Sequence, residues 1–436
     1  MRVWIVGAVA GALSAGTSAQ SFDGRIAAVA DADMVASAYA DGRLEPLDAA
    51  EGADSVILIE ERSGRLVELD RAPASNSVIS WPHVIEASAN GRTVYVVETR
   101  GSMPGIEAVQ NVYEDFPAGQ TLIAYRVEAD RFVEIGQADV GPSPESVSRS
   151  PDGRWLIVAT RDPEAEVAFV ALSEEGAPGR VVRADIDLGG FEQGEDGLNG
   201  LIWSPVDDLI AANIANKDLV IYRVERDGNG NPFSLSQTSE ALRVGEQWSV
   251  GKWTPDGRHY VITDTGWGDA RGLSLLIQPR GHLSSVRVHQ DGSADIADRL
   301  VIGLSPEGFD ISPDGALIAA VNMRRTYLPD NPLLALWPGR NRSSLSLVSL
   351  DPDTGALQAA GDQVFFEGVL PEDAIFDADG DSLAVATFHL RSGPGRRLGY
   401  VDLWRVENTS QGPRAVDLNE RLATVRGPHD LVRLAE

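Results

Sequence analysis

A short phrase recurs along this chain: an apolar run, a tight turn, and a second apolar run. Six turns of this kind lie about 50 to 65 residues apart: Ser88-Ala89-Asn90-Gly91, Ser150-Pro151-Asp152-Gly153, Ser204-Pro205-Val206-Asp207, Thr254-Pro255-Asp256-Gly257, Ser312-Pro313-Asp314-Gly315 and Asp377-Ala378-Asp379-Gly380. Proline presets the first φ of such a turn, Asp or Asn bonds back to the backbone, and glycine takes the positive φ. A repeat of this length, built only from short strands, predicts a β-propeller.

Each turn joins two expected strands, and a second pair of alternating runs follows to complete four antiparallel strands, or one blade. The expected outer pairs are Thr121–Arg126 with Phe132–Gly136, Val167–Leu172 with Arg180–Ile186, Asp218–Val224 with Ala241–Gly245, Leu273–Gln278 with Ser285–His289, Leu345–Leu350 with Val364–Glu367, and Tyr400–Val406 with Leu422–Arg426. These segments account for six blades.

The two ends of the chain supply a seventh blade. Ile26–Ala30, Val56–Glu60 and Leu66–Leu69 read as three strands without an inner partner, and residues 428–434 read as an orphan inner strand. If the last strand pairs with the first, the ring closes and leaves no exposed sheet edge. We therefore predict an all-β, seven-bladed β-propeller closed by N-terminal and C-terminal strands that share one blade.

The amino-acid composition limits the classes of partner that we expect for this protein. The chain of 436 residues carries 65 acidic and 37 Lys or Arg residues, for a net charge of −28. Nucleic acid and anionic lipid require clustered Lys and Arg to replace their counterions, so neither is an expected partner. The sequence contains no cysteine, which excludes disulfides and thiolate chemistry. Beyond the N-terminus, no apolar run approaches the ~20 residues of a membrane-spanning helix.

The N-terminus resembles a secretory signal peptide. Arg2 precedes an apolar stretch from Val3 to Ala15, and Thr17-Ser18-Ala19 is a plausible cleavage site. We expect residues 1–19 to be removed and residues 20–436 to form a single propeller domain. The expected location is the periplasm or the exterior of the cell. Three long insertions, 31–54, 100–120 and 323–343, follow the second strand of their blades and are interpreted either as lids or as irregular segments.

Several phrases resemble the repeats of bacterial YVTN-type propellers. They are Pro82-His83-Val84, Ser150-Pro151-Asp152-Gly153, Pro428-His429-Asp430 and the run from Ser305 to Gly315. That superfamily includes the phosphogluconolactonase-like lactonases. The resemblance lies in the spacing of the repeats and extends over residues 20–436. It implies the propeller fold, and it implies lactone hydrolysis as one expected activity.

The repeat also predicts which side chains meet at the mouth of the central channel. Counting eight residues back from each turn marks the start of every inner strand: His83, Glu145, Asn199, Ser249, Glu307, Glu372 and, in the closing blade, His429. The loops after the second strands emerge on the same face and carry Arg100, Arg161, Asp264, Trp267, Arg324, Arg325, His389 and Arg391. Carboxylates held this close should have at least one raised pKa. Such mixed clusters in a concave mouth are typical of small-molecule sites.

Two classes of function stay open. The first is a non-catalytic exported propeller that binds a small molecule or a protein at the channel mouth, since fold alone does not define chemistry. The second is a lactone or ester hydrolase. In it, His83 or His429 is the general base, Glu145 or Glu372 orients that base or donates a proton, and arginines stabilise the oxyanion.

The remaining candidates concern binding. Arg100, Arg161 and Arg324 are candidates to hold a substrate carboxylate or phosphate, and Trp267 to stack on a sugar ring, although packing between blades would also explain the tryptophan. A variant of the site holds Ca²⁺ through the oxygen ligands Glu145, Asn199, Glu307 and Glu372.

Overall fold

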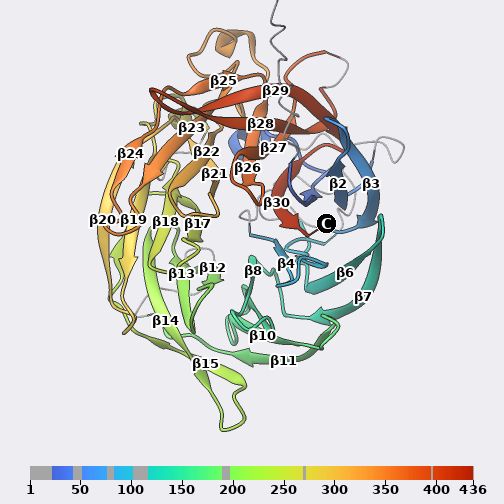
Figure 1. Cartoon of the computed structure of the whole chain (residues 1–436), viewed down its shortest axis with the longest axis vertical. Helices are drawn as coiled ribbons and strands as arrows, with labels where there is room; N and C mark the ends of the chain where they lie inside the picture. Colours follow the sequence, from blue (N-terminus) through green and yellow to red (C-terminus); the bar gives the residue numbers. More distant parts are fainter. Residues whose placement is uncertain are drawn as a thin grey trace, which may run out of the picture.

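Seven antiparallel sheets surround a central axis and confirm the predicted seven-bladed propeller (Figure 1). The computed structural model describes residues 22–42, 52–75, 83–101, 116–188, 197–268, 272–393 and 396–435. The signal-peptide prediction and large parts of the insertions 31–54 and 100–120 lie outside these residues.

The closing blade is blade 1, and its strands, from the axis outward, are β30 (Pro428–Leu434), β1 (Arg25–Ala30), β2 (Ser55–Glu61) and β3 (Leu66–Pro73). Blade 2 contains β4 (Ile85–Ala87), β5 (Thr93–Val97), β6 (Thr121–Glu128) and β7 (Arg131–Asp139). Blade 3 contains β8 (Ser146–Arg149), β9 (Trp155–Ala159), β10 (Val167–Leu172) and β11 (Pro178–Ala184). Blade 4 contains β12 (Leu198–Trp203), β13 (Leu209–Ile214), β14 (Asp218–Arg226), β15 (Pro232–Gln237) and the short β16 (Leu242–Arg243).

Blade 5 contains β17 (Trp248–Trp253), β18 (His259–Asp264), β19 (His282–Val288) and β20 (Ala294–Val301). Blade 6 contains β21 (Pro306–Ile311), β22 (Leu317–Asn322), β23 (Ser343–Leu350), β24 (Leu357–Ala359) and β25 (Val364–Phe366). Blade 7 contains β26 (Val369–Phe376), β27 (Ser382–His389), β28 (Gly399–Thr409) and β29 (Gly412–Thr424). The helical elements of the described residues are α1 (Ala38–Asp41), η2 (Gly272–Leu276) and η3 (Pro332–Leu334).

Ring closure follows the predicted arrangement. β30 pairs antiparallel with β1, with Ala27 opposite Val432 and Arg25 opposite Leu434. The first and last strands of the described residues therefore lie in one sheet, and the edge of β1 is covered. Apolar residues of the second and third strands, such as Ile157 of β9 and Phe169 of β10, pack between neighbouring blades and form the core.

The repeated turns form for the predicted reasons. In the turn after β8, the Asp152 carboxylate accepts from the Ser150 hydroxyl at 2.7 Å, and that hydroxyl oxygen accepts from the Trp155 N–H at 3.0 Å. Gly153 has a φ of 67°, in the left-handed region that favours glycine. These local bonds set the register of the strand pair that follows.

Two expected outer strands are wrong. Leu273–Gln278 is not a strand, because its first four residues lie in the 3₁₀ helix η2, and the outer pair of blade 5 is β19 with β20. In blade 4, only Leu242–Arg243 of the expected strand 241–245 pairs with β14, and β15 supplies the main outer strand. In blade 5, the apolar Leu275 of this run packs in a buried cluster with residues of the insertions rather than in a sheet ladder.

Side chains from neighbouring blades fasten the inner strands to one another. Each inner strand has an edge that faces the channel, and buried backbone N–H groups there need an acceptor. The Asp310 carboxylate accepts from the Phe376 N–H, and the Asp373 carboxylate accepts from the Leu431 N–H. Asp430 accepts from the N–H groups of Val84 and Ile85, and the Ser146 hydroxyl accepts from the Leu201 N–H. A carboxylate or hydroxyl thus joins blade 6 to 7, 7 to 1, 1 to 2 and 3 to 4.

The insertions form an apolar cap on the face where the inner strands begin. Met34 and Ala36 of blade 1, Phe116 of blade 2, Leu275 of blade 5 and Tyr327 of blade 6 belong to one buried cluster. α1 contacts η2, although blades 1 and 5 are not neighbours in the ring. The cap therefore crosses the mouth of the channel, and the described parts of these insertions are packed.

Candidate functional site

The predicted ring of inner-strand beginnings exists and is enclosed. Six of its members are 0–4% exposed: Glu145, Asn199, Ser249, Glu307, Glu372 and His429. The seventh, His83, is half-buried. Its Nε2 accepts from the Gly251 N–H of blade 5 at 3.4 Å, so side chains far apart in sequence do converge at the axis. Their catalytic and ligand-binding roles stay predictions.

Both ring histidines are held neutral. Burial lowers the pKa of His83 to about 3, and the nearby ammonium group of Lys252 lowers it further. Burial alone lowers the pKa of His429 to about 3. His429 is fully buried, so the burial that keeps its imidazole uncharged also separates it from solvent.

The ring carboxylates have partners within the protein. Arg161 donates from Nε to the Glu145 Oε1 at 2.5 Å, which joins a predicted substrate-binding residue to a predicted catalytic one. The Ser249 hydroxyl donates to Glu307. Burial raises the pKa of Glu307 to about 8 against that hydrogen bond, so this carboxyl is mostly protonated at neutral pH.

The predicted calcium ligands do not gather into one cluster. The Asn199 amide donates to the Gly197 carbonyl at 3.2 Å, while Glu145 and Glu307 have the partners described above. Among the residues that the structure describes, no group of three or more His, Cys, Asp or Glu side chains could hold a metal ion. Calcium binding stays a prediction.

Below the ring, a half-buried lysine lies among carboxylates from three blades. Lys252 Nζ lies 3.5 Å from Asp310 and 3.6 Å from Asp373. Burial opposes its charge, but these carboxylates and Asp430 outweigh burial and raise the pKa of Lys252. Burial raises the pKa of Asp373 to about 6 and also raises that of Asp430. In the channel interior, the positive charge of Lys252 therefore offsets negative charge on the carboxylates around it.

The other predicted binding residues lie outside this ring. The Trp267 indole N–H donates to Ser305 at 2.9 Å, and its ring lies 4.9 Å from that of Tyr327, so Trp267 packs in the cap. The Arg324 guanidinium stacks over Phe365 at 4.7 Å. Arg100 forms an isolated backbone bridge with Ala118. Each of these three residues thus has contacts within the protein, and their binding roles stay predictions.

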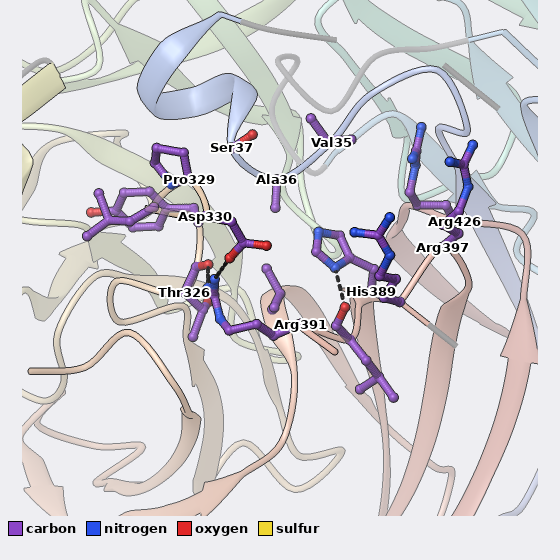
Figure 2. Close-up of a pocket in the computed structure, with 15 residues that line it drawn as sticks. Val35, Ala36, Ser37, Thr326, Pro329, Asp330, His389, Arg391, Arg397 and Arg426 are labelled. Atoms are coloured by element: carbon purple, nitrogen blue, oxygen red, sulfur yellow. Dashed lines mark hydrogen bonds and ion pairs between the residues drawn. The ribbon is translucent and has the colours of Figure 1, made fainter. Parts of the chain in front are cut away.

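An open pocket lies on the same face, displaced from the axis. Its volume is about 150 Å³, and it lies where β26 begins, where β27 ends and beside the insertions from blades 1 and 6 (Figure 2). Its polar and charged lining residues are Ser37, Thr326, Tyr327, Asp330, His389, Arg391, Arg396, Arg397 and Arg426. The lining contains four arginines and one carboxylate, so this pocket is basic although the protein as a whole is strongly acidic.

The imidazole of His389 lines this pocket and is held by a hydrogen bond to the backbone. Its Nδ1 lies 2.8 Å from the Leu390 carbonyl oxygen, and because a carbonyl only accepts, Nδ1 carries the proton. Nε2 is then the basic nitrogen. Figure 2 shows the imidazole between Asp330 on one side and Arg397 and Arg426 on the other.

Arg426 is fixed by the fold. It is 1% exposed, and its Nη2 donates to the Ala32 carbonyl at 2.7 Å. A buried guanidinium at a cavity wall acts in low dielectric, where its charge is worth more than in water. The pocket can therefore place a basic nitrogen and a rigid cation around one small molecule.

Sequence reasoning identified His389 and Arg391 only as members of an outer ring, and it missed Asp330, Arg396, Arg397 and Arg426. One signal was present. Arg391, Arg396 and Arg397 fall within seven residues of a chain whose net charge is −28. Such a local excess of arginine indicates an anion-facing surface.

Solved structures of similar shape define the class of fold. The periplasmic gluconolactonase of Pseudomonas aeruginosa superposes with a TM-score of 0.63 and 16% identity, over 94% of this chain and 99% of that chain. A putative 6-phosphogluconolactonase from Bacteroides fragilis gives 0.59 and 14%, over 94% and 98%. One from Bacteroides uniformis gives 0.60 and 12%, over 94% and 99%. This chain therefore has the fold of the lactonase-like seven-bladed propellers.

The amino-acid sequence itself has little in common with the sequences of these proteins. No protein-family model matches the chain, and no curated protein sequence matches it significantly. Identities of 12–16% establish the architecture, so the chemistry must be argued from the pocket. No helix in the described part of the chain is long and apolar enough to cross a membrane.

Proposed function

We propose that this protein hydrolyses a small sugar lactone in the pocket that contains His389 and Arg426. The single observation that carries the proposal is their juxtaposition in one open cavity of about 150 Å³. That volume lies below the ~300–1,000 Å³ of drug-sized sites, so it suits a small molecule. The fold shared with the Pseudomonas aeruginosa gluconolactonase supports the choice of substrate class.

The residues of the pocket provide a base and an electrophile. His389 Nε2 takes a proton from water as the water oxygen attacks the lactone carbonyl carbon. The carbonyl oxygen becomes an oxyanion, and the guanidinium groups of Arg426 and Arg397 stabilise it. The ring C–O bond then breaks, and the imidazolium returns its proton to the alkoxide. The product is the open-chain hydroxy acid.

We place the general base in this pocket rather than on the channel axis because His389 lines the pocket and is half-buried. Of the two ring histidines, His429 is fully buried beneath the cap, and Nε2 of His83 already accepts from the Gly251 N–H. A substrate must reach its general base within hydrogen-bond distance. On this proposal the ring residues of the axis hold the blades together, and His389 is the base.

A second candidate is non-catalytic binding of a small molecule in the same pocket. The concentration of four arginines around one cavity favours it, because guanidinium groups hold carboxylates and phosphates without any reaction. A hydrolase would convert its ligand into product, whereas a non-catalytic binding protein would leave the ligand unchanged. The signal-like N-terminus supports a further proposal, that the chain acts after export.

The test is a pH-stat assay of purified protein with D-glucono-1,5-lactone, corrected for spontaneous hydrolysis. We expect acid release that scales with enzyme concentration and is lost in His389→Gln. His289→Gln is a matched control, because that histidine is exposed and paired with Asp295 on an outer strand. If acid release equals the uncatalysed rate while gluconate still binds, the non-catalytic candidate replaces the hydrolase.

A further inference from the structure

The pocket already contains a negatively charged side chain of the protein itself. Asp330 is the one acidic residue among those that line the pocket. A single carboxylate oxygen, Oδ1, accepts from Arg340 Nη2 at 2.6 Å and from Arg391 Nη1 at 3.0 Å. Two guanidinium groups converging on one oxygen form the arrangement in which proteins bind a carboxylate or phosphate.

Each of the two arginines has a backbone acceptor besides the Asp330 carboxylate. Arg340 Nη2 also donates to the Pro329 carbonyl at 3.0 Å, and Arg391 Nη2 donates to the Thr326 carbonyl. The Arg340 side chain is only 6% exposed. The cations would therefore keep their positions if the carboxylate left.

Asp330 is held far less firmly than its partners. Its side chain is 68% exposed, so water can solvate the carboxylate as soon as it turns away. Ion pairs with such an exposed member contribute little to stability. Its departure would leave Arg340 and Arg391 facing each other without this counterion. Burial, together with the neighbouring charge of Arg340, already lowers the pKa of Arg391. An incoming anion would restore the balance.

We propose that Asp330 is a resident stand-in for a ligand anion, and that a carboxylate or phosphate group of the ligand displaces it from Arg340 and Arg391. This inference deepens the proposed function, because it assigns an anionic group to the ligand of the same pocket. The displaced carboxylate also sets specificity, since only a ligand whose anion competes with it gains both guanidinium contacts.

The test measures binding rather than turnover, so it can succeed or fail separately from the hydrolase proposal. The full-length protein and Asp330→Asn are titrated calorimetrically with inorganic phosphate in one arm and sodium acetate in the other. We expect Asp330→Asn to bind at least one of these anions ten or more times as tightly as the wild type does. The arm that shows the gain identifies phosphate or carboxylate as the preferred group.

Two further variants keep the result interpretable. Asp353→Asn removes another exposed aspartate paired with an arginine, Arg258 at 3.1 Å, outside the pocket, and should leave anion affinity unchanged. Asp330→Asn combined with Arg391→Gln should lose the gain. Equal or weaker binding of both anions by Asp330→Asn, or no measurable binding, overturns the proposal, and Asp330→Ala with an unchanged melting curve repeats the test if the first variant misfolds.

Discussion

The carboxylate of Asp430 accepts the backbone N–H of Val84 at 2.8 Å, which joins the last strand of the chain to the inner strand of blade 2. The same oxygen accepts from the N–H of Ile85 at 3.2 Å. Closure of the ring therefore has two parts: the β30–β1 ladder inside blade 1 and a side-chain bond across the seam to blade 2.

Removing the Asp430 carboxylate should destabilise the ring. Asp430→Ala leaves two buried N–H groups without their acceptor, and each such group costs about 1–3 kcal/mol. We expect the free energy of unfolding to fall by at least ~2 kcal/mol, measured by urea denaturation. Asp353→Ala, at an exposed position, should shift it little. An Asp430→Ala midpoint equal to that of the wild type would show that the seam bond is dispensable.

Truncation tests the ladder itself. A chain that ends at Arg426 lacks β30, so β1 becomes an exposed edge and the inner strand of blade 1 is missing. We expect loss of the cooperative melting transition and aggregation in size-exclusion chromatography. Full solubility together with an unchanged melting temperature would contradict the closure by terminal strands.

Asp373 should make stability depend on pH. Burial raises its pKa from 3.8 to about 6 in the folded protein, against the opposing charge of Lys252. Between these values the folded state retains a proton that the unfolded state has lost, so the contribution of Asp373 to stability falls as the pH rises from about 4 to 6.

We therefore expect Asp373→Asn to show a weaker decline in unfolding free energy than the wild type across this window. Urea midpoints at several pH values between about 4 and 6 measure it. The exposed Asp353→Asn variant should keep the wild-type slope. A wild-type slope in Asp373→Asn would mean that Asp373 ionises normally in the fold.

The cap should unfold locally when its aromatic pair is broken. Trp267→Ala removes the ring that packs against Tyr327 and the hydrogen bond to Ser305. We expect faster amide hydrogen exchange in η2 and in residues 323–328, with little change in the inner strands, because the cap is a separate apolar cluster. Phe233→Ala, at a half-exposed position on β15, is the control. Uniform exchange changes throughout the blades would show that the cap is not a distinct unit.

Catalysis should depend on His389. General acid–base groups contribute about 10²–10⁴-fold to rate, so His389→Gln should lose at least ~100-fold in kcat on D-glucono-1,5-lactone. His429→Gln, which alters a buried ring residue, should retain most of the activity of the folded fraction. The opposite ranking would return the reaction to the channel axis. Melting curves of both variants separate loss of activity from loss of fold.

The propeller could be predicted because residues close together in the sequence specify each turn and its pair of strands. Each Ser-Pro-Asp-Gly turn forms its own hydrogen bonds, as Asp152 shows, and the repeat multiplies that signal around the ring. The same repeat spacing predicted that the inner strands of different blades begin close together, as the contact between His83 and Gly251 shows. Leu273–Gln278 was misread because leucine-rich runs in a cap and in a strand have the same composition.

The open pocket could not be predicted in the same way. Asp330, His389 and Arg426 come from insertions and strand ends whose paths follow no repeat, and the cap that buries the axis depends on contacts such as that of α1 with η2. The repeat predicts which residues face the channel, but it carries no information about what covers them.

A crystal structure of the protein soaked with gluconate would locate the site of lactone hydrolysis. We expect the product in the pocket, with its carboxylate or hydroxyl oxygens within hydrogen-bond distance of His389 Nε2 and a guanidinium nitrogen of Arg426. Gluconate bound instead beside His83 and His429 in the channel would contradict this expectation.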